Sequence, residues 1–143
     1  MMQRSVTVKI EWSAGHRIFP YEGKCERPHG HNYRAFITLG AAVLDGNDMV
    51  LDFAVLKKDI GAWIDTYWDH AFLLDSRDEQ LRSALELVPE AKIFLFESRK
   101  PTAEILAQTL VEVVSGMDLP VQEVQIWETD KQYASVSQTS PES

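Results

Sequence analysis

The side chains best suited to chemistry are concentrated in one short window near the start of the chain. Three of the four histidines, His16, His29 and His31, fall within sixteen residues, and the only cysteine, Cys25, lies between them. Imidazole is a common metal ligand, and a thiol beside a metal can act as a base or a nucleophile. Chance rarely gathers a chain's whole supply of sulfur and most of its imidazole in this way. The pattern predicts a metal site with a reactive thiol next to it.

The residues around these histidines have the alternation of two β-strands. Apolar and polar side chains alternate over residues 6–12, and a second alternation runs over residues 29–39. Successive side chains of a strand point to opposite faces, so His29 and His31 project from one face. His16 comes just past the end of the first strand. If the two strands are neighbours, it supplies a third imidazole to the same place.

Three histidines with an open fourth position are the donor set of a catalytic zinc rather than a structural one. We therefore expect His16, His29 and His31 to bind one Zn²⁺. The alternative is that they are ordinary loop or core histidines, which a lone His-x-His pair would favour. The presence of His16 and Cys25 beside that pair favours the metal site.

The composition is that of a small soluble enzyme. The chain has 143 residues, of which 45% are hydrophobic, and is long enough to bury one core. No segment reaches the apolar length of a membrane span, and the first residues lack the apolar core of a signal peptide. We therefore expect a cytoplasmic protein with no membrane partner. A lone cysteine also excludes an internal disulfide.

The charge distribution favours a small anionic ligand over nucleic acid. The net charge of −8 argues against a general nucleic-acid-binding surface. Residues 1–34 nevertheless hold six basic and three acidic side chains. Because these cations surround the expected metal loop, they can produce a local positive field that attracts an anionic small molecule. For any single Lys or Arg, ordinary solvated surface remains the alternative.

The rest of the chain alternates between helical and extended patterns. Asp52 is a candidate N-cap for a helix that continues to Tyr67, because apolar residues recur there every three or four positions. The further elements that we expect are a short helix over residues 81–87, a strand over 92–96, a helix from Pro101 to Gly116, strands over 121–129 and 133–136, and a polar tail over 137–143.

Six motifs in order along the chain resemble those of one family. They are Ser13-Ala14-Gly15-His16, the Cys25–Tyr33 element with its His-Gly-His-Asn-Tyr end, Met49–Phe53, Trp68-Asp69-His70, Pro101–Glu104 and Trp127-Glu128-Thr129. Together they span roughly residues 6–136, and they resemble the 6-pyruvoyl-tetrahydropterin synthase family, which includes bacterial 6-carboxytetrahydropterin synthases. The Cys-x-x-x-His-Gly-His element is the specific part, whereas the later motifs are persuasive only in combination.

The resemblance implies an α+β tunnelling fold (T-fold). We expect one synthase domain over residues 1–136, with an antiparallel four-stranded sheet, two main helices packed on one face and the order ββααββ. Residues 137–143 would form a flexible polar tail. In the resembled family, subunits join their sheets into a barrel, so we expect a homohexamer built from two trimers with shared active sites.

The resemblance also implies a catalytic role for Asp69 and His70. In the family, this pair comes from a neighbouring subunit and completes a catalytic triad with the cysteine, here Cys25. A carboxylate can hold an imidazole in one tautomer and stabilise its protonated form. From the residues alone, a helix C-cap with a solvated histidine is an equally good interpretation.

Glu128, Thr102 and Glu104 are candidate substrate-binding residues. Glu128 is expected on the apolar face of its strand, where a carboxylate is costly unless it is paired. A pterin offers two adjacent N–H donors, and the resemblance implies that Glu128 accepts them; the alternative is a strand-end glutamate that reaches solvent. Thr102 and Glu104 either line the pocket or serve the start of a helix, and for Thr102 we prefer a helix cap.

These residues lead to a pterin triphosphate lyase as the expected function. The substrate would be 7,8-dihydroneopterin triphosphate, and the leading hypothesis is a zinc-dependent 6-carboxytetrahydropterin synthase of queuosine biosynthesis. The second is a 6-pyruvoyl-tetrahydropterin synthase, which eliminates triphosphate. The third is a non-catalytic zinc-containing protein that binds pterins or purines, but it would not need Cys25, Asp69 and His70 together.

Overall fold

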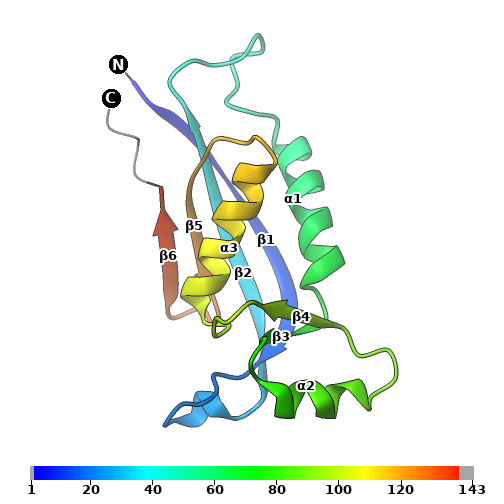
Figure 1. Ribbon diagram of the computed structural model, residues 1–143. Helices are drawn as coiled ribbons and strands as arrows, with labels where there is room; N and C mark the ends of the chain where they lie inside the picture. The colour runs from blue at the N-terminus through cyan, green and yellow to red at the C-terminus, as the bar shows by residue number, and fades with distance from the viewer. Residues whose placement is uncertain (1, 139–143) are drawn as a thin grey trace.

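The computed structural model describes residues 2–138 as one six-stranded sheet with helices packed against it (Figure 1). The strand order in the sheet is β4-β3-β1-β2-β5-β6. The elements along the chain are β1 (Arg4–His16), the 3₁₀ turn η1 (Lys24–Glu26), β2 (His29–Ala41), α1 (Phe53–Tyr67), β3 (Ala71–Asp75), α2 (Glu79–Glu86), β4 (Ile93–Phe96), α3 (Ala103–Gly116), β5 (Val121–Trp127) and β6 (Tyr133–Ser137).

A long antiparallel hairpin, β1 with β2, forms the centre of the sheet. The two strands pair along their whole length, and the register places His16 opposite His29 and Ala14 opposite His31. β1 extends further than the sequence alternation predicted, so His16 is the last residue of the strand and not a loop residue beyond it. The hairpin therefore brings all three histidines to one end of the sheet.

Strands of different orientation are added on each side of this hairpin. β5 pairs with β2, and β6 with β5, both antiparallel. On the other side, β3 runs parallel to β1, and β4 parallel to β3. Parallel neighbours need a crossover connection, and α1 and α2 supply it (Figure 1).

The helices α1 and α3 lie on one face of the sheet and bury its apolar side chains (Figure 1). α1 contributes Leu56, Ile60 and Ile64 to the core, in agreement with the predicted helical spacing. Its first turn is capped by the carboxylate of Asp52, which accepts a hydrogen bond from the amide of Ala54 at 2.8 Å. An N-cap of this kind typically stabilises a protein by about 1 kcal/mol.

The predicted four-stranded antiparallel sheet with ββααββ order is wrong. The order of strands and α-helices is ββαβαβαββ, and the sheet is mixed and six-stranded. β3 was missed because most of its five residues are buried, so it shows no polar–apolar alternation. The predicted strand at residues 92–96 exists as β4, but its place beside β3 in the sheet was not foreseen.

The remaining boundaries agree with the sequence patterns to within a few residues. α2 begins two residues before the expected position, and α3 ends at Gly116 as predicted. Of the expected polar tail, Ser137 pairs with Glu123 in the sheet and the amide of Gln138 donates to Gln122; residues 139–143 lie outside the described part. Within residues 2–138, no helix has the length and apolar character needed to cross a membrane.

Candidate active site

The three N-terminal histidines converge at the end of the β1–β2 hairpin. One ring nitrogen from each of His16, His29 and His31 lies within 4.8 Å of the others. The Nε2 atoms of His16 and His29 are 3.0 Å apart. His16 is almost completely buried, whereas His29 and His31 are partly exposed. The predicted juxtaposition of the three imidazoles is therefore present.

Backbone carbonyls fix the orientation of two of these rings. The Nδ1 of His16 donates to the carbonyl of Pro101 at 2.7 Å, and the Nδ1 of His29 donates to the carbonyl of Arg27 at 2.6 Å. A carbonyl oxygen only accepts, so both protons reside on Nδ1 and both Nε2 atoms present lone pairs. Two lone pairs facing each other at 3.0 Å are mutually repulsive, and a cation between them would remove that repulsion.

The electrostatics of the cluster also favour a cation other than a proton. The pKa of His16 is lowered to about 4, mainly by burial; the Pro101 carbonyl opposes this change, and the neighbouring His29 and His31 add to it. Burial and His29 likewise lower the pKa of His31. The Nε2 of His31 is buried without a hydrogen-bond partner, although a Glu128 carboxylate oxygen lies 3.3 Å away. Three clustered imidazoles, two of which present Nε2 lone pairs, are a fitting donor set for a divalent metal.

A cavity of about 530 Å³ opens beside this cluster. Its lining includes His16, Cys25, Thr102, Glu104 and Glu128, five of the residues singled out in the sequence. Their elements are the end of β1, the 3₁₀ turn η1, the start of α3 and the segment after β5. A cavity of this size can bury a bicyclic ring system.

Cys25 lies on the exposed turn η1 at the edge of the cavity. The loop that carries it is tied back to the segment just after β1, because the amide of Ile18 donates to the Cys25 carbonyl at 2.7 Å. A second tie comes from Lys100, whose Nζ donates to the Pro20 carbonyl at 2.8 Å. The thiol is therefore held near the histidine cluster by contacts of its backbone, while its side chain stays accessible.

The carboxylates in the cavity are partly withdrawn from water. The pKa of Glu128 is raised, mainly by burial; His29 opposes this and the charge of Glu104 adds to it. The hydroxyl of Thr102 accepts a hydrogen bond from the Ile105 amide at 3.2 Å, so the expected helix cap is confirmed. The same start of α3 thus brings Glu104 into the cavity and, through the preceding Pro101, orients a histidine ring.

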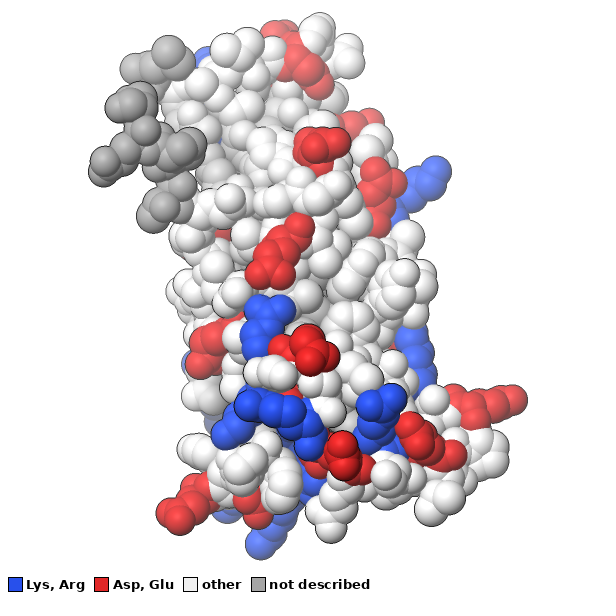
Figure 2. Space-filling model, viewed as in Figure 1, with Lys and Arg blue, Asp and Glu red and all other residues white. Residues whose placement is uncertain are grey.

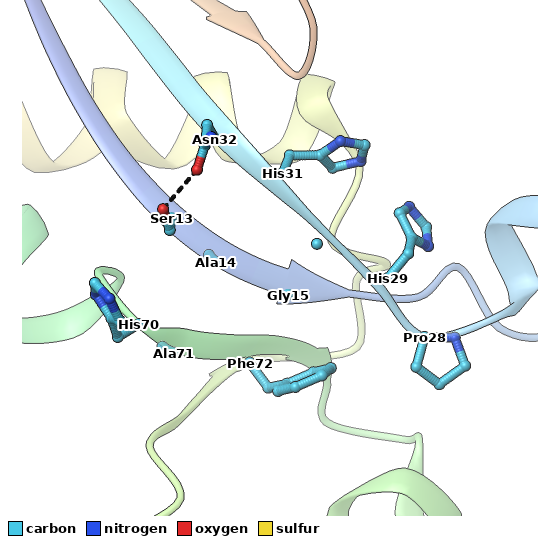
Figure 3. Close-up of a pocket in the computed structure, with 11 residues that line it drawn as sticks. Ser13, Ala14, Gly15, Pro28, His29, His31, Asn32, His70, Ala71 and Phe72 are labelled. Atoms are coloured by element: carbon cyan, nitrogen blue, oxygen red, sulfur yellow. Dashed lines mark hydrogen bonds between the residues drawn. The ribbon is translucent and has the colours of Figure 1, made fainter.

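Asp69 and His70 lie in a turn that directly follows α1, apart from the cavity of Cys25. The Nδ1 of His70 is 2.9 Å from a carboxylate oxygen of Asp69, and the His70 side chain is 80% exposed. His70 borders a second hollow of about 580 Å³, which His29, His31, Ser13 and Phe72 also line (Figure 3). In that view, β1 passes between His70 and the ring of His31. The two hollows have no lining residue in common.

Two arginines at this end of the molecule are paired with carboxylates. On the face in Figure 2, Lys and Arg gather toward the end of the molecule where α2 and η1 lie, with Asp and Glu among them. Arg17, next to His16, is bonded through its Nε to a buried carboxylate of Asp78 at 2.7 Å. Arg77 is bonded to Asp75 at 2.6 Å. The positive field expected from the charge count is therefore partly neutralised by these ion pairs.

Sequence reasoning missed the groups that orient the site. The carbonyl of Pro101, the Arg17–Asp78 ion pair and the contacts of Lys100 were not among the expected functional features. Backbone carbonyls have no sequence signature of their own. The one available signal for Pro101 was its position in the Pro-Thr-Ala-Glu motif.

Comparison with known proteins finds one family along almost the whole chain. A family model described as 6-pyruvoyl tetrahydropterin synthase matches residues 5–139. The 6-carboxy-5,6,7,8-tetrahydropterin synthase of Rickettsia felis is 32% identical over 91% of this chain and 97% of its own length. The protein of the same name from Aquifex aeolicus is 29% identical over 90% of this chain and 94% of its own length.

Solved structures agree with the fold. The 6-pyruvoyl tetrahydropterin synthase of Caenorhabditis elegans superposes with a TM-score of 0.71, at 27% identity, and covers 97% of this chain and 98% of its own. An uncharacterised protein from Wolinella succinogenes gives a TM-score of 0.82 at 21% identity, over 97% of this chain and all of its own. At that identity the second likeness describes the fold alone.

Proposed function

The chain belongs to the 6-pyruvoyl tetrahydropterin synthase family, and from that premise we propose that it is a 6-carboxytetrahydropterin synthase. The proposed reaction converts 7,8-dihydroneopterin triphosphate and water to 6-carboxy-5,6,7,8-tetrahydropterin, acetaldehyde and triphosphate. The observation that carries this proposal is a cavity lined by His16 of the three-histidine cluster, by the accessible thiol of Cys25 and by the carboxylates of Glu104 and Glu128. The curated relatives named as 6-carboxytetrahydropterin synthases favour this product.

The metal in this proposal is Zn²⁺, held by His16, His29 and His31. Zinc, when bound, supplies a Lewis acid that polarises substrate oxygens at neutral pH. His16 and His29 keep their Nε2 lone pairs free for a metal, because backbone carbonyls accept the protons on their Nδ1 atoms. Burial of His16 excludes water from one side of the cluster.

Cys25, Asp69 and His70 are the proposed proton carriers. The Cys25 thiolate removes a carbon-bound proton from the substrate side chain, for which its exposed position at the cavity edge is suited. His70 delivers or accepts the matching proton, and Asp69, 2.9 Å from its Nδ1, holds the ring and stabilises its protonated form. Because His70 does not line the cavity that holds Cys25, we propose that it serves the cavity of a neighbouring subunit.

Glu128 and Glu104 are the proposed pterin anchors. A pterin presents a ring N–H and an amino group side by side, and a carboxylate can accept both, as it does from an Arg fork. Burial raises the pKa of Glu128 because it withdraws the carboxylate from water. The two N–H groups of the pterin would replace that water as hydrogen-bond donors. The Thr102 hydroxyl faces its own helix, so its part in substrate binding is to hold the α3 end that carries Glu104.

The assembly that goes with this function is a homohexamer of two trimers in the cytoplasm, with active sites shared between chains. The six-stranded sheet ends in the edge strands β4 and β6, and exposed edges of this kind favour pairing with another chain. Queuosine biosynthesis is the proposed pathway, and no nucleic-acid or membrane partner is part of this proposal.

A second candidate function is supported by one comparison. The C. elegans structure, 27% identical, is named a 6-pyruvoyl tetrahydropterin synthase. That reaction eliminates triphosphate and leaves the side-chain carbons attached to the pterin. The two candidates therefore differ in whether a two-carbon fragment is released.

One incubation separates the candidates. The zinc-loaded protein is mixed with 7,8-dihydroneopterin triphosphate, the pterin product is identified by mass spectrometry, and acetaldehyde is measured with an aldehyde-specific reagent. We expect 6-carboxytetrahydropterin and one acetaldehyde per turnover, and a Cys25→Ala variant is the inactive control. A pyruvoyl product without acetaldehyde would establish the second candidate, and unchanged substrate would contradict both.

A further inference from the structure

Lys92, the residue before β4, contacts the end of a helix far from it in sequence. Its Nζ donates to the backbone carbonyls of Asp65 and Asp69, at 2.8 Å each. The first carbonyl belongs to the last turn of α1, and the second to the turn that follows. The final carbonyls of a helix lack partners within it and carry partial negative charge, so a cation is favoured there. Lys92 therefore caps α1 from a position 23 residues beyond Asp69.

The turn that Lys92 caps is the one that presents His70. His70 has φ of 59°, in the left-handed region that residues other than glycine seldom adopt. On its other side the turn is fastened to Ser13 of β1, whose carbonyl accepts from the His70 amide at 2.7 Å and whose amide donates to Asp69 Oδ1 at 3.2 Å. An unfavourable backbone conformation persists only where surrounding contacts hold it.

We propose that Lys92 is a positioning residue for the Asp69–His70 pair. Its ammonium group holds the Asp69 carbonyl, and this keeps the next residue in the left-handed conformation that directs the imidazole outward. The His70 side chain is 80% exposed, so its direction is set by the backbone of the turn and by its contact with Asp69 rather than by packing. The consequence for catalysis rests on the role proposed above for the pair.

Lys92→Met tests this proposal because methionine keeps the unbranched side chain but cannot donate. We expect kcat to fall on the order of tenfold to a hundredfold, since misplacing a reacting group by about 1 Å has an effect of that size. KM and zinc content should stay unchanged, because Lys92 is absent from the lining of the cavity that holds Cys25 and Glu128. Lys92→Arg should restore most of the activity, because a guanidinium can donate to both carbonyls.

Two controls separate positioning from general damage. Lys57→Met removes an exposed lysine of α1 and should leave kcat and KM as in the wild type. In a His70→Ala background, Lys92→Met should cause no further loss of turnover, because the group through which it acts is already gone. If the methionine variant does not fold, Lys92→Gln, which keeps one donor group, should show the same loss to a smaller degree.

A spectroscopic readout tests the geometry without any turnover. Nitrogen NMR of the His70 ring should show the Nδ1–H tautomer in the wild type, with a smaller fraction in Lys92→Met as the contact with Asp69 loosens. An unchanged His70 spectrum with unchanged kcat would overturn the proposal, as would a loss of zinc or a rise in KM equal to the loss in kcat. If the wild type does not turn over the pterin triphosphate, the proposed function fails, and the NMR comparison still decides whether Lys92 holds the turn.

Discussion

The histidine cluster and the Asp69–His70 turn use the same type of side chain in opposite surroundings. His16 is 2% exposed, its Nδ1 is bonded to a carbonyl, and burial lowers its pKa to about 4. His70 is 80% exposed, its Nδ1 contacts a carboxylate, and its ring lies outside the cavity of Cys25. The first arrangement suits a permanently neutral ligand, and the second suits a group that exchanges protons. One chain thus gathers three histidines in one cluster and presents the fourth on its surface.

The largest expected effect concerns the buried half of this comparison. His29→Ala should abolish stoichiometric zinc binding, because two imidazoles cannot hold the metal as three do. Metal content by atomic emission after gel filtration is the measurement. His70→Ala, which removes the fourth histidine, is the matched control and should keep one zinc per chain. Full zinc content in the His29 variant would show that the cluster is not the metal site.

The reactive thiol is expected to have the next largest effect. Cys25→Ala should lower turnover on the order of 10²–10⁴-fold, the usual contribution of an acid–base group. The fold, the zinc content and the binding of a non-reacting pterin should persist, because the contact that fastens η1 uses the Cys25 carbonyl and not its side chain. Steady-state rates and pterin titrations measure the two properties. Turnover at the wild-type level would make the thiol a bystander.

The pH dependence of stability tests whether His16 is buried in its neutral form. In the zinc-free protein, the unfolded chain protonates His16 near its ordinary pKa of 6.5, whereas the folded chain does so only near pH 4. The unfolded state therefore binds more protons in this range, and the free energy of unfolding should fall as the pH is lowered from 6.5 to 4, by about 3 kcal/mol.

Urea unfolding of the chelated protein, followed by tryptophan fluorescence, measures this dependence. Glu128 works in the opposite direction because its pKa is raised, so the comparison is best made in a Glu128→Gln background. The pKa of Asp75 is lowered, mainly by its hydrogen bonds from Arg77, so this carboxylate acts in the same direction as His16 as the pH approaches 4. A His16→Asn variant should show a shallower slope, because His31, whose pKa is also lowered, still contributes. A stability that does not change between pH 6.5 and 4 would contradict the assignment of a buried neutral His16.

The smallest effect, but the most direct test of the comparison, is recovery of activity in mixed oligomers. Cys25→Ala and His70→Ala proteins are each expected to be inactive, and each retains the half that the other lacks. After unfolding together and co-assembly, some interfaces combine an intact Cys25 with an intact His70, so part of the activity should return. Tagged subunits verify that mixing has occurred. Mixed oligomers that remain inactive would mean that each chain completes its own site.

The sequence predicted what strand periodicity and local spacing can encode. The convergence of His16, His29 and His31 followed from alternation in two strands, and both helix caps, Asp52 and Thr102, followed from their positions before apolar helical patterns. These features depend on residues close together in the chain or on one simple pairing. The family resemblance added the T-fold, which the solved structures support.

Features that depend on contacts between distant segments were not predictable in the same way. β3 is buried along most of its length, so its sequence has no alternation. It pairs with β1 on one side and with β4 on the other, and these two strands enlarge the sheet from the expected four strands to six. The Pro101 carbonyl that orients His16 lies 85 residues from it in the chain. Such contacts are created by tertiary packing and leave no periodic signal.

The register of the β1–β2 hairpin has a consequence for how this scaffold can be altered. The three histidines lie on paired strands. Their positions are fixed by the pairing of His16 with His29 and not by the loop between the strands. Residues 18–26, which leave out Arg27 and its carbonyl contact with His29, can therefore be shortened, lengthened or exchanged for a different sequence without moving the three imidazoles. A designer could replace the segment that carries Cys25 with one bearing another reactive group and keep the histidine cluster. The same separation leaves the reactive group free to change while the three histidines stay in place.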